Sequence, residues 1–317
     1  MMEIKRHEMA DAFQRFARAG SGIVVGPPGV GKTHLLKTAC AAFHDEGIPF
    51  LYLPLDRLGG DAAQDPGDEL GLGCPLTTYL QAQKTCRSDR PGILIIDAFD
   101  ATRSENQRKH LLALISRVRS RFGGTWNVIL SARTYDARHS GLLQTLFPPG
   151  DGDPPDYQVP GIACRHFAVP RLTGSELQAA IESNLGMRAA VSGAPGEFQE
   201  LLRIPFNLVL LERLIDHDPG ILGSTPIRTE TELLDLVWDR LVLAGDQREE
   251  RRALLTRLTR RMVEQHTLSL RREEVGGTEG VDDLLDAGVL IDASLTGQRV
   301  AYAHPILFDH AVSTFLI

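Results

Sequence analysis

The sequence predicts an α/β fold, in which a doubly wound parallel sheet is followed by a helical part and a C-terminal winged helix. Short apolar runs alternate with helical patterns over about 20–170, which is typical of a parallel sheet with helices on both faces. From 174 to 265 the apolar residues recur only at helical spacing. The last part, about 230–317, has the order helix, helix and hairpin, which is the outline of a winged helix.

The strands of the predicted sheet are short apolar runs bounded by glycine, proline or charge. The third run ends in a carboxylate and is apolar throughout, which is typical of a central strand buried on both faces. The five predicted strands are 23–25, 50–53, 93–96, 126–130 and 166–169.

The helices of the α/β part are predicted from apolar residues three and four positions apart, at 8–18, 35–43 and 105–121. Two segments rich in glycine, proline and aspartate interrupt this order. We expect a loop at 59–75, and at 147–161 an insertion with no packing pattern.

The C-terminal half changes from alternating elements to helices and then to a hairpin. The hairpin joins 290–291 to 300–302 across Thr296-Gly297, and a last helix follows His304-Pro305. The order of elements predicts an α/β core, a helical lid subdomain and a winged-helix domain. Their expected bounds are 1–172, 173–228 and 229–317.

The composition is that of an ordinary globular protein, with 43% hydrophobic and 24% charged residues among 317. A net charge of −7 weakens, without excluding, a bulk role on nucleic acid. No run approaches the ~18 apolar residues of a membrane span, and the N-terminus has no apolar signal core. The four cysteines form no C-x-x-C pair, so we expect reduced thiols, no zinc site and a cytoplasmic protein.

The strongest motif is Gly26-Pro27-Pro28-Gly29-Val30-Gly31-Lys32-Thr33, which fits G-x-x-x-x-G-K-[ST] between a strand and a helix. Glycines let the backbone curl around a phosphate, and the helix N-terminus adds positive potential. Lysine would neutralise β- and γ-oxygens, and threonine would supply a hydroxyl to Mg²⁺. We expect ATP or ADP to contact Gly26, Pro28, Gly29, Val30, Gly31, Lys32, Thr33 and His34.

A second metal anchor is expected from Asp97, at the carboxyl end of the central apolar strand. It would hold Mg²⁺ together with Thr33, directly or through water. Asp100 lies three residues further on, where a carboxylate polarises the attacking water or, as the alternative, caps a helix.

Arg133 ends the strand Val128-Ile129-Leu130-Ser131-Ala132. A guanidinium at this edge would reach a γ-phosphate and distinguish ATP from ADP. The alternative is a surface arginine paired with an acid. Lys32, Asp97, Asp100 and Arg133 are therefore the expected catalytic set.

Together these motifs resemble the STAND NTPases, the signal-transduction ATPases that include NACHT and NB-ARC proteins within the AAA+ group. The resemblance covers about 20–317. It implies that Pro205, at the start of a helix, packs on the adenine, and that His304 contacts the ADP phosphate in the resting state. Each has a structural alternative: Pro205 as a helix starter and His304 as a structural residue before proline.

The sequence departs from that family at two points. Many NACHT proteins carry a glutamate directly after the second aspartate of this strand end, where this chain has Ala101, so fast hydrolysis would require Asp100. The chain also stops at Ile317 inside an apolar-periodic helix, from which we expect either a piece of a longer protein or a helix that docks on a partner. The sequence does not choose between ATP and GTP.

Three functions follow as hypotheses. The first is a switch that ADP holds closed and ATP opens into an oligomer or onto a protein partner, for signalling or antiviral defence. The second is an AAA+ ATPase acting on DNA, such as a replication initiator or helicase loader, through its winged helix. The arginines of 248–261 could contact phosphates there, although acidic residues are interleaved with them and a solvated helix face is the favoured explanation. The third is a nucleotide-binding fold without turnover.

Overall fold

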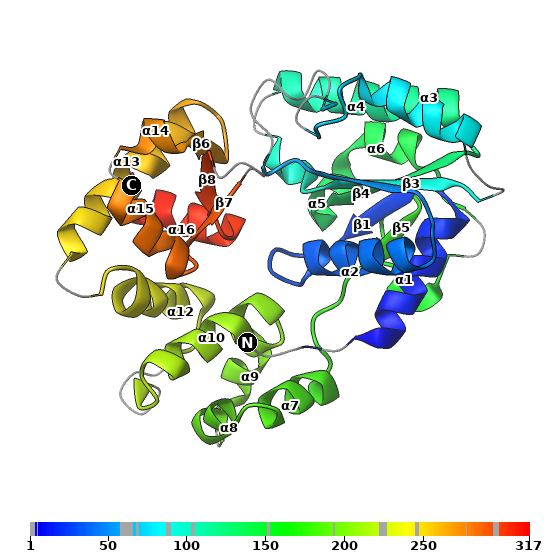
Figure 1. The fold of residues 1–317 in the computed structure, drawn as a ribbon. Coiled ribbons are helices and arrows are strands. Elements are labelled where there is room, and N and C mark those ends of the chain that lie inside the picture. Colours follow the sequence, from blue (N-terminus) through cyan, green and yellow to red (C-terminus); the bar gives the residue numbers. More distant parts are fainter. Residues whose placement is uncertain are drawn as a thin grey trace.

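The computed structural model describes residues 4, 6–57, 66–67, 70–86, 90–102, 105–150, 153–192, 194–221, 227–244, 247–276, 278–293 and 298–317. It consists of an α/β core, a helical part and a winged helix (Figure 1). Within these ranges no helix has both the length and the apolar character that a membrane span requires.

The core is a five-stranded parallel sheet in the order β2-β3-β4-β1-β5, which confirms the doubly wound prediction. All five strands fall where the apolar runs predict them. Their bounds are β1 Gly22–Val25, β2 Phe50–Pro54, β3 Gly92–Asp97, β4 Trp126–Ala132 and β5 His166–Ala168.

Alternate residues of each strand face opposite layers of helices. Ile93 and Ile95 of β3 pack in the cluster that contains α1 (His7–Ala19) and α2 (Lys32–Asp45). Leu94 and Ile96 pack in the opposite cluster, which α3, α4, α5 and α6 cover. The bounds of these four helices are Leu76–Cys86, Glu105–Phe122, Thr134–His139 and Gly141–Leu146.

The insertion at 147–161 differs from its prediction, because part of it packs on the sheet. A 3₁₀ turn at Pro155–Tyr157 stacks the Tyr157 ring on Phe167 of β5, with ring centroids 4.5 Å apart. Gln158 also donates a side-chain hydrogen bond to the His166 carbonyl. Phe147, at the start of the segment, is also fully buried. These aromatic residues are too scattered among prolines to form any periodicity. The loop expected at 59–75 and the hairpin turn at Thr296-Gly297 lie largely outside the described residues.

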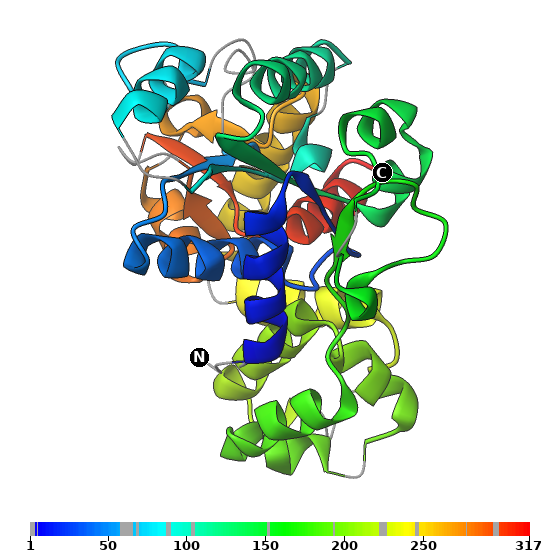
Figure 2. The ribbon, with the colours of Figure 1, turned by 90° about the vertical axis from the view of Figure 1, so that its right-hand side faces the viewer.

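The helical part lies below the sheet in both ribbon views (Figures 1 and 2). A capping box at Thr173 and Glu176 starts its first helix, and proline occupies the first turn of α10. Its helices are α7 Gly174–Glu182, α8 Leu185–Val191, α9 Gly196–Leu202, α10 Pro205–His217 and α12 Glu230–Val237, which continues as a π-turn at Trp238–Val242.

The last part has winged-helix topology, with an antiparallel sheet in the order β6-β8-β7. One apolar cluster runs through the helical part and this domain, so the division expected at 228 stays a prediction. The elements are α13 Arg248–Glu264, β6 Ser269–Arg271, α14 Arg272–Val275, α15 Thr278–Asp286, β7 Leu290–Asp292, β8 Arg299–Tyr302 and α16 Pro305–Phe315.

Candidate nucleotide site

The phosphate-loop motif forms a tight turn between β1 and α2. Gly29 and Gly31 have φ angles of +75° and +96°, in the left-handed region that glycine adopts without a steric penalty. Gly31 is the N-cap of α2, and no side chain caps the helix there. A Cβ built on Gly31 would meet no atom within 4 Å. The helix therefore begins with unsatisfied amides beside open space, which suits a phosphate.

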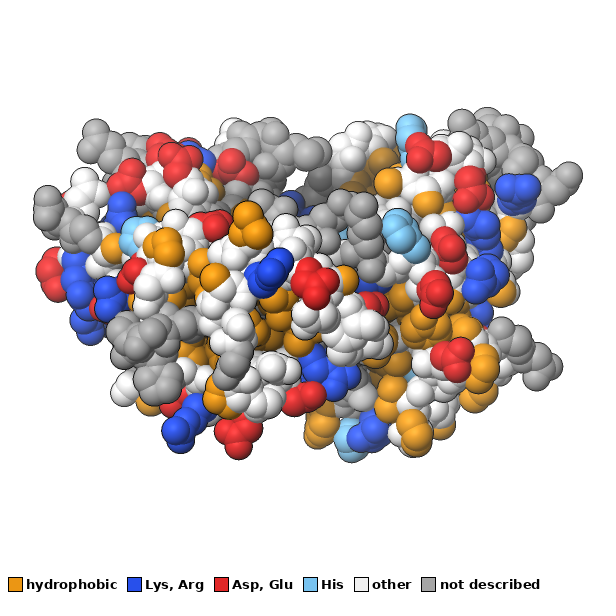
Figure 3. All heavy atoms as spheres, turned by 90° about the horizontal axis from the view of Figure 1, so that it is seen from below, with side chains coloured by type: hydrophobic (Ala, Val, Ile, Leu, Met, Phe, Trp, Pro, Cys, Tyr) orange, Lys and Arg blue, Asp and Glu red, His pale blue; other side chains and the backbone are white. Residues whose placement is uncertain are grey.

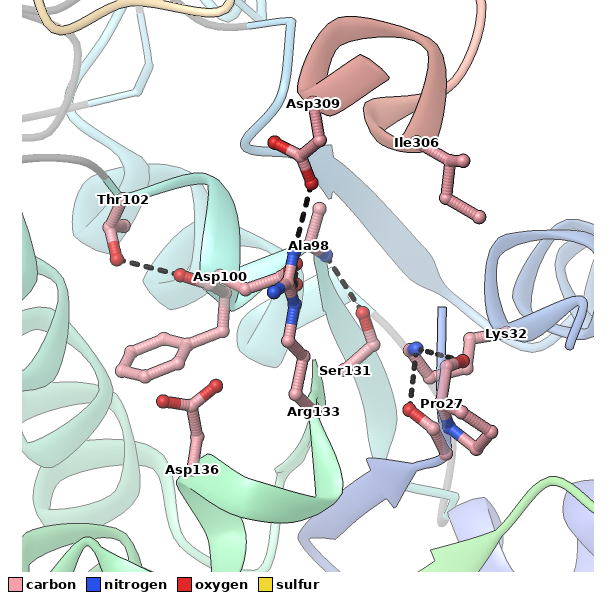
Figure 4. Close-up of polar contacts among 12 residues, drawn as sticks. Pro27, Lys32, Ala98, Asp100, Thr102, Ser131, Arg133, Asp136, Ile306 and Asp309 are labelled. Carbon is pink, nitrogen blue, oxygen red and sulfur yellow. Dashed lines mark hydrogen bonds and ion pairs between the residues drawn. The ribbon is translucent and has the colours of Figure 1, made fainter. Parts of the chain in front are cut away.

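Lys32 extends along this turn. Its Nζ donates hydrogen bonds to the carbonyl oxygens of Gly26, at 2.9 Å, and Pro27, at 3.1 Å (Figure 4). Burial lowers the pKa of Lys32, and Arg133 acts in the same direction, while Asp100 and Asp97 oppose the shift. Because burial disfavours the charged ammonium, an anion bound beside it would be strongly stabilising.

Asp97 ends β3 with only 2% of its surface exposed. Its Oδ1 accepts hydrogen bonds from the Ala98 amide, at 2.9 Å, and from the Ser131 hydroxyl. Its Oδ2 accepts one from the Tyr52 hydroxyl, at 2.7 Å. These donors satisfy a buried carboxylate at the sheet edge where open α/β sheets bind ligands.

The chain turns sharply after Asp97. Ala98 has φ +62°, an uncommon value for a residue with a Cβ, and a 3₁₀ turn at Phe99–Ala101 follows. This turn directs Asp100 toward Arg133, whose Nε donates to Asp100 Oδ2 at 2.7 Å. Asp100, expected to polarise the attacking water, and Arg133, expected to contact the γ-phosphate, thus form an ion pair with each other (Figure 4).

The helical part and the winged helix both reach the phosphate loop. The Phe206 amide of α10 donates a hydrogen bond to the Gly29 carbonyl at 3.1 Å. A Cβ on Gly29 would lie 2.9 Å from Phe206 Cβ and 3.3 Å from Ile306 Cδ1 of α16. The three parts of the chain therefore meet at one glycine of the loop.

His304 lies at this junction as the N-cap of α16. Its ring stacks on Phe206, with centroids 4.1 Å apart. Its Nδ1 accepts a hydrogen bond from the Ile306 amide, so the neutral ring carries its proton on Nε2. Burial, aided by Lys32 and opposed by Asp100, lowers the pKa of His304 to about 4.

Arg133 also faces the winged helix. Its guanidinium lies 4.0 Å from the Asp309 carboxylate of α16, in addition to its closer pair with Asp100. Asp309 was not expected from the sequence, because nothing local distinguishes it from other exposed acids. Only the docking of α16 brings it to the core.

The structure gathers most of the expected residues at one edge of the sheet. Lys32, Asp97, Asp100, Arg133 and His304 converge there, while Thr33 and His34 are exposed on the first turn of α2. Pro205 begins α10 beside Phe206, in the position of a helix starter. The roles of these residues toward a nucleotide stay predictions.

Two residues near Asp97 were missed. Tyr52 was assigned only to a strand, although it points along β2 to the same sheet edge. Asp56 follows the same strand, and burial, with a smaller contribution from Asp97, raises the pKa of Asp56 to about 6. Topology could have indicated both residues. Neighbouring parallel strands end at the same edge of the sheet, so polar residues near the end of the strand 50–53 were candidates for the nucleotide site.

The basic segment of α13 is largely occupied by contacts within the chain. Arg248 pairs with Asp239, and Arg251 pairs with Asp283 of α15. Arg257 and Arg261 donate to backbone carbonyls. These contacts favour the solvated, structural explanation of the segment.

The site residues fit a nucleotide and a metal ion by their chemistry. The loop offers unsatisfied amides and a buried ammonium to phosphates, and Asp97 offers an oxygen ligand of the kind Mg²⁺ prefers. In the described part of the chain, no three His, Cys, Asp or Glu side chains are grouped as ligands of another metal.

Comparison with known proteins agrees with this geometry. Residues 23–144 match the AAA family, "ATPase family associated with various cellular activities". No curated protein matches the chain. Cdc6p from Pyrobaculum aerophilum is similar at a TM-score of 0.42 and 10% identity, over 99% of this chain and 97% of that one. The Aeropyrum pernix ORC1 protein, solved in complex with DNA, is similar at 0.39 and 12%, over 98% and 93%.

The two structural similarities are too low to carry an argument about function. The family match is to the wider AAA group and lends nothing to the narrower STAND and NACHT expectation. It spans the phosphate loop, the β3 carboxylate and Arg133. Residues 23–144 are thus an ATPase domain of the AAA type, built on the P-loop NTPase fold.

Proposed function

We propose that this AAA-type ATPase is a nucleotide-controlled conformational switch. One observation carries the proposal: the phosphate loop is hydrogen-bonded to Phe206 of the helical part and lies beside Ile306 of the winged helix, which would be 3.3 Å from a Cβ added at Gly29. A nucleotide bound at the loop would touch groups from all three parts. Because a ligand shifts a conformational equilibrium only by its difference in affinity between two states, such a shared site couples nucleotide state to domain arrangement.

In this proposal Lys32 neutralises the phosphates, and His304 donates from Nε2 to the terminal phosphate of ADP. Thr33 and Asp97 would hold Mg²⁺, which supplies charge neutralisation at the β- and γ-oxygens. Asp100 is the candidate for orienting the attacking water. Its ion pair with Arg133 occupies it in the closed form, so hydrolysis is expected to be slow until that pair opens.

A second copy or a protein partner would bind the opened form through apolar side chains. Tyr135 and Leu142, which follow Arg133 in the chain, could contribute to that surface because they are 71% and 64% exposed in the closed form as well. The proposal does not extend to antiviral defence, for which the family resemblance was the only ground.

Lys32→Ala tests the site, with Lys37→Ala as the matched control that removes the same charge one turn further along α2. We expect the first variant to weaken ADP and ATP binding about 100-fold or more, because it removes the ammonium from the phosphates. The control should bind as the wild type does. Isothermal titration would measure both, and unchanged binding by Lys32→Ala would refute the site assignment.

The second candidate is an AAA+ ATPase that acts on DNA. The winged-helix topology favours it, as do Arg252 and Arg260 of α13, two exposed residues whose side chains have no hydrogen bond or ion pair within the described part of the chain. The helix that winged-helix proteins place in the DNA groove, α15, instead carries Asp282, Asp283 and Asp286.

A further inference from the structure

We propose that Tyr52 is a positioning residue for the metal-binding carboxylate, and that it makes Oδ2 of Asp97 the atom that faces Mg²⁺. The inference rests on the proposed nucleotide site and adds a residue that no motif contains. The observation behind it is the 2.7 Å hydrogen bond from the Tyr52 hydroxyl to Asp97 Oδ2.

Among the described residues, more donors contact Oδ1 of Asp97 than Oδ2. An ionised carboxylate has about four lone-pair positions, two on each oxygen. Oδ1 accepts from the Ser131 hydroxyl and from the Ala98 amide, whose single hydrogen is shared with Ser131 Oγ. On Oδ2 the structure shows one donor among the described residues, Tyr52. The oxygen that Tyr52 holds is therefore the one with fewer donors.

The direction of both donors is fixed by their partners. Ser131 Oγ accepts from the Ala98 amide at 2.7 Å, so its own hydrogen is free to point at Asp97. Tyr52 faces an oxygen that can only accept, and it must donate. A phenol is protonated near neutral pH, so its hydroxyl has a hydrogen to donate.

The strand register places the phenol on the correct face of the sheet. Tyr52 pairs with Ile95 and Pro54 with Asp97, so the ring extends two residues along β2 to reach the carboxylate. Tyr52 packs against the cluster formed by α1 and α2, the same face to which Ile93 and Ile95 point. Asp97 has the same parity on β3, so its side chain is held toward α2, the helix that carries Thr33.

The inference predicts a specific defect. Without the Tyr52 hydroxyl, Asp97 Oδ2 loses the one hydrogen bond that the described residues give it. The carboxylate is then freer to rotate about its Cβ–Cγ bond. Groups that orient a metal ligand typically change metal affinity 10–100-fold when they are removed. The phosphate contacts of Lys32 lie on a different element and should be unaffected.

The experiment uses Tyr52→Phe, with Tyr79→Phe on α3 as the matched control that removes a phenol elsewhere. Mn²⁺ binding to the ADP-loaded protein would be titrated by electron paramagnetic resonance, and ADP binding would be measured in EDTA. We expect the Mn²⁺ dissociation constant of Tyr52→Phe to rise about tenfold or more. ADP binding in EDTA should stay unchanged, and the control should match the wild type in both measurements.

Each other outcome has a distinct meaning. A Tyr52→Phe protein with wild-type Mn²⁺ affinity overturns the positioning role while leaving the nucleotide site intact. Equal losses of Mn²⁺ and ADP binding would mean a general structural role, which also overturns it. A wild-type protein that binds neither ADP nor Mn²⁺-ADP would refute the proposed function itself.

Discussion

At the scale of single residues, His304 shows how burial sets the properties of a side chain. Its ring is stacked on Phe206 and faces the ammonium of Lys32, and both circumstances disfavour a second proton. The Nδ1 hydrogen bond to the Ile306 amide also requires that this nitrogen be unprotonated. The neutral ring is therefore part of the closed arrangement.

The pKa of His304 predicts how stability depends on pH. Because the folded value, about 4, lies below the ordinary 6.5, the unfolded chain binds the proton more readily. The contribution of neutral His304 to the free energy of unfolding is fully present above about pH 6.5, and it is lost as the pH falls toward about 4. Melting temperatures of wild type and His304→Gln between pH 8 and 5 would show a difference that shrinks in acid.

The control for this measurement is His217→Gln, an exposed histidine at the end of α10. Its melting temperature should follow the wild type at every pH. The comparison with His304→Gln also cancels the effect of His310, whose pKa burial lowers as well. Parallel curves for wild type and His304→Gln would contradict the assignment.

At the scale of elements, the phosphate loop has two glycines of similar conformation and different surroundings. Gly29 and Gly31 both have positive φ angles, so alanine at either position should cost about 1–2 kcal/mol of backbone strain. Only at Gly29 would the added Cβ meet Phe206, Ile204 and Ile306 at 3.3 Å or less. Its contacts belong to the helical part and the winged helix.

This difference predicts that Gly29→Ala opens the molecule and Gly31→Ala does not. Both variants should lose some thermal stability for the shared reason of strain. Small-angle scattering should find a larger radius of gyration for Gly29→Ala alone, together with faster proteolysis between the core and the helical part. Identical radii for the two variants would show that the contacts at Gly29 do not hold the domains.

The elements were predictable from the sequence to different degrees, for physical reasons. The strands and the phosphate loop follow from local patterns: apolar runs such as 93–96, and glycines at fixed spacing before Lys32. The insertion at 147–161 packs through scattered residues such as Phe147 and Tyr157, which no period reveals.

The contacts between elements were harder to predict from the sequence. Lys32, Asp97 and Arg133 could be placed at one edge because parallel strands end together. The roles of Tyr52 and Phe206 depend on register and on the docking of α10, which bring together residues far apart in sequence. The spacing of residues within one segment of the sequence does not predict such long-range contacts.

At the scale of the whole molecule, charge argues against strong nucleic-acid binding. The chain carries a net charge of −7. On the face seen from below, basic and acidic side chains are interspersed rather than separated (Figure 3). Most arginines of α13 are engaged within the chain, and the aspartates of α15 would face phosphates if that helix entered a groove.

We therefore predict that duplex DNA binds weakly and with a shallow salt dependence. If only Arg252 and Arg260 contact phosphates, the slope of log affinity against log salt should be about −2. Fluorescence anisotropy between 50 and 200 mM salt would measure it, with the double variant Arg252→Ala/Arg260→Ala as control. A slope of about −5 or steeper would favour the DNA-acting candidate over the switch.

The guanidinium of Arg133 lies between two carboxylates that belong to different domains, Asp100 of the core and Asp309 of α16. One cation thus screens two anions across the boundary. Were a third phosphate to draw that cation inward, the 4.0 Å ion pair that links Asp309 of α16 to the core would be lost. Recruitment of one arginine would then both report the incoming nucleotide and weaken the contact between the two domains.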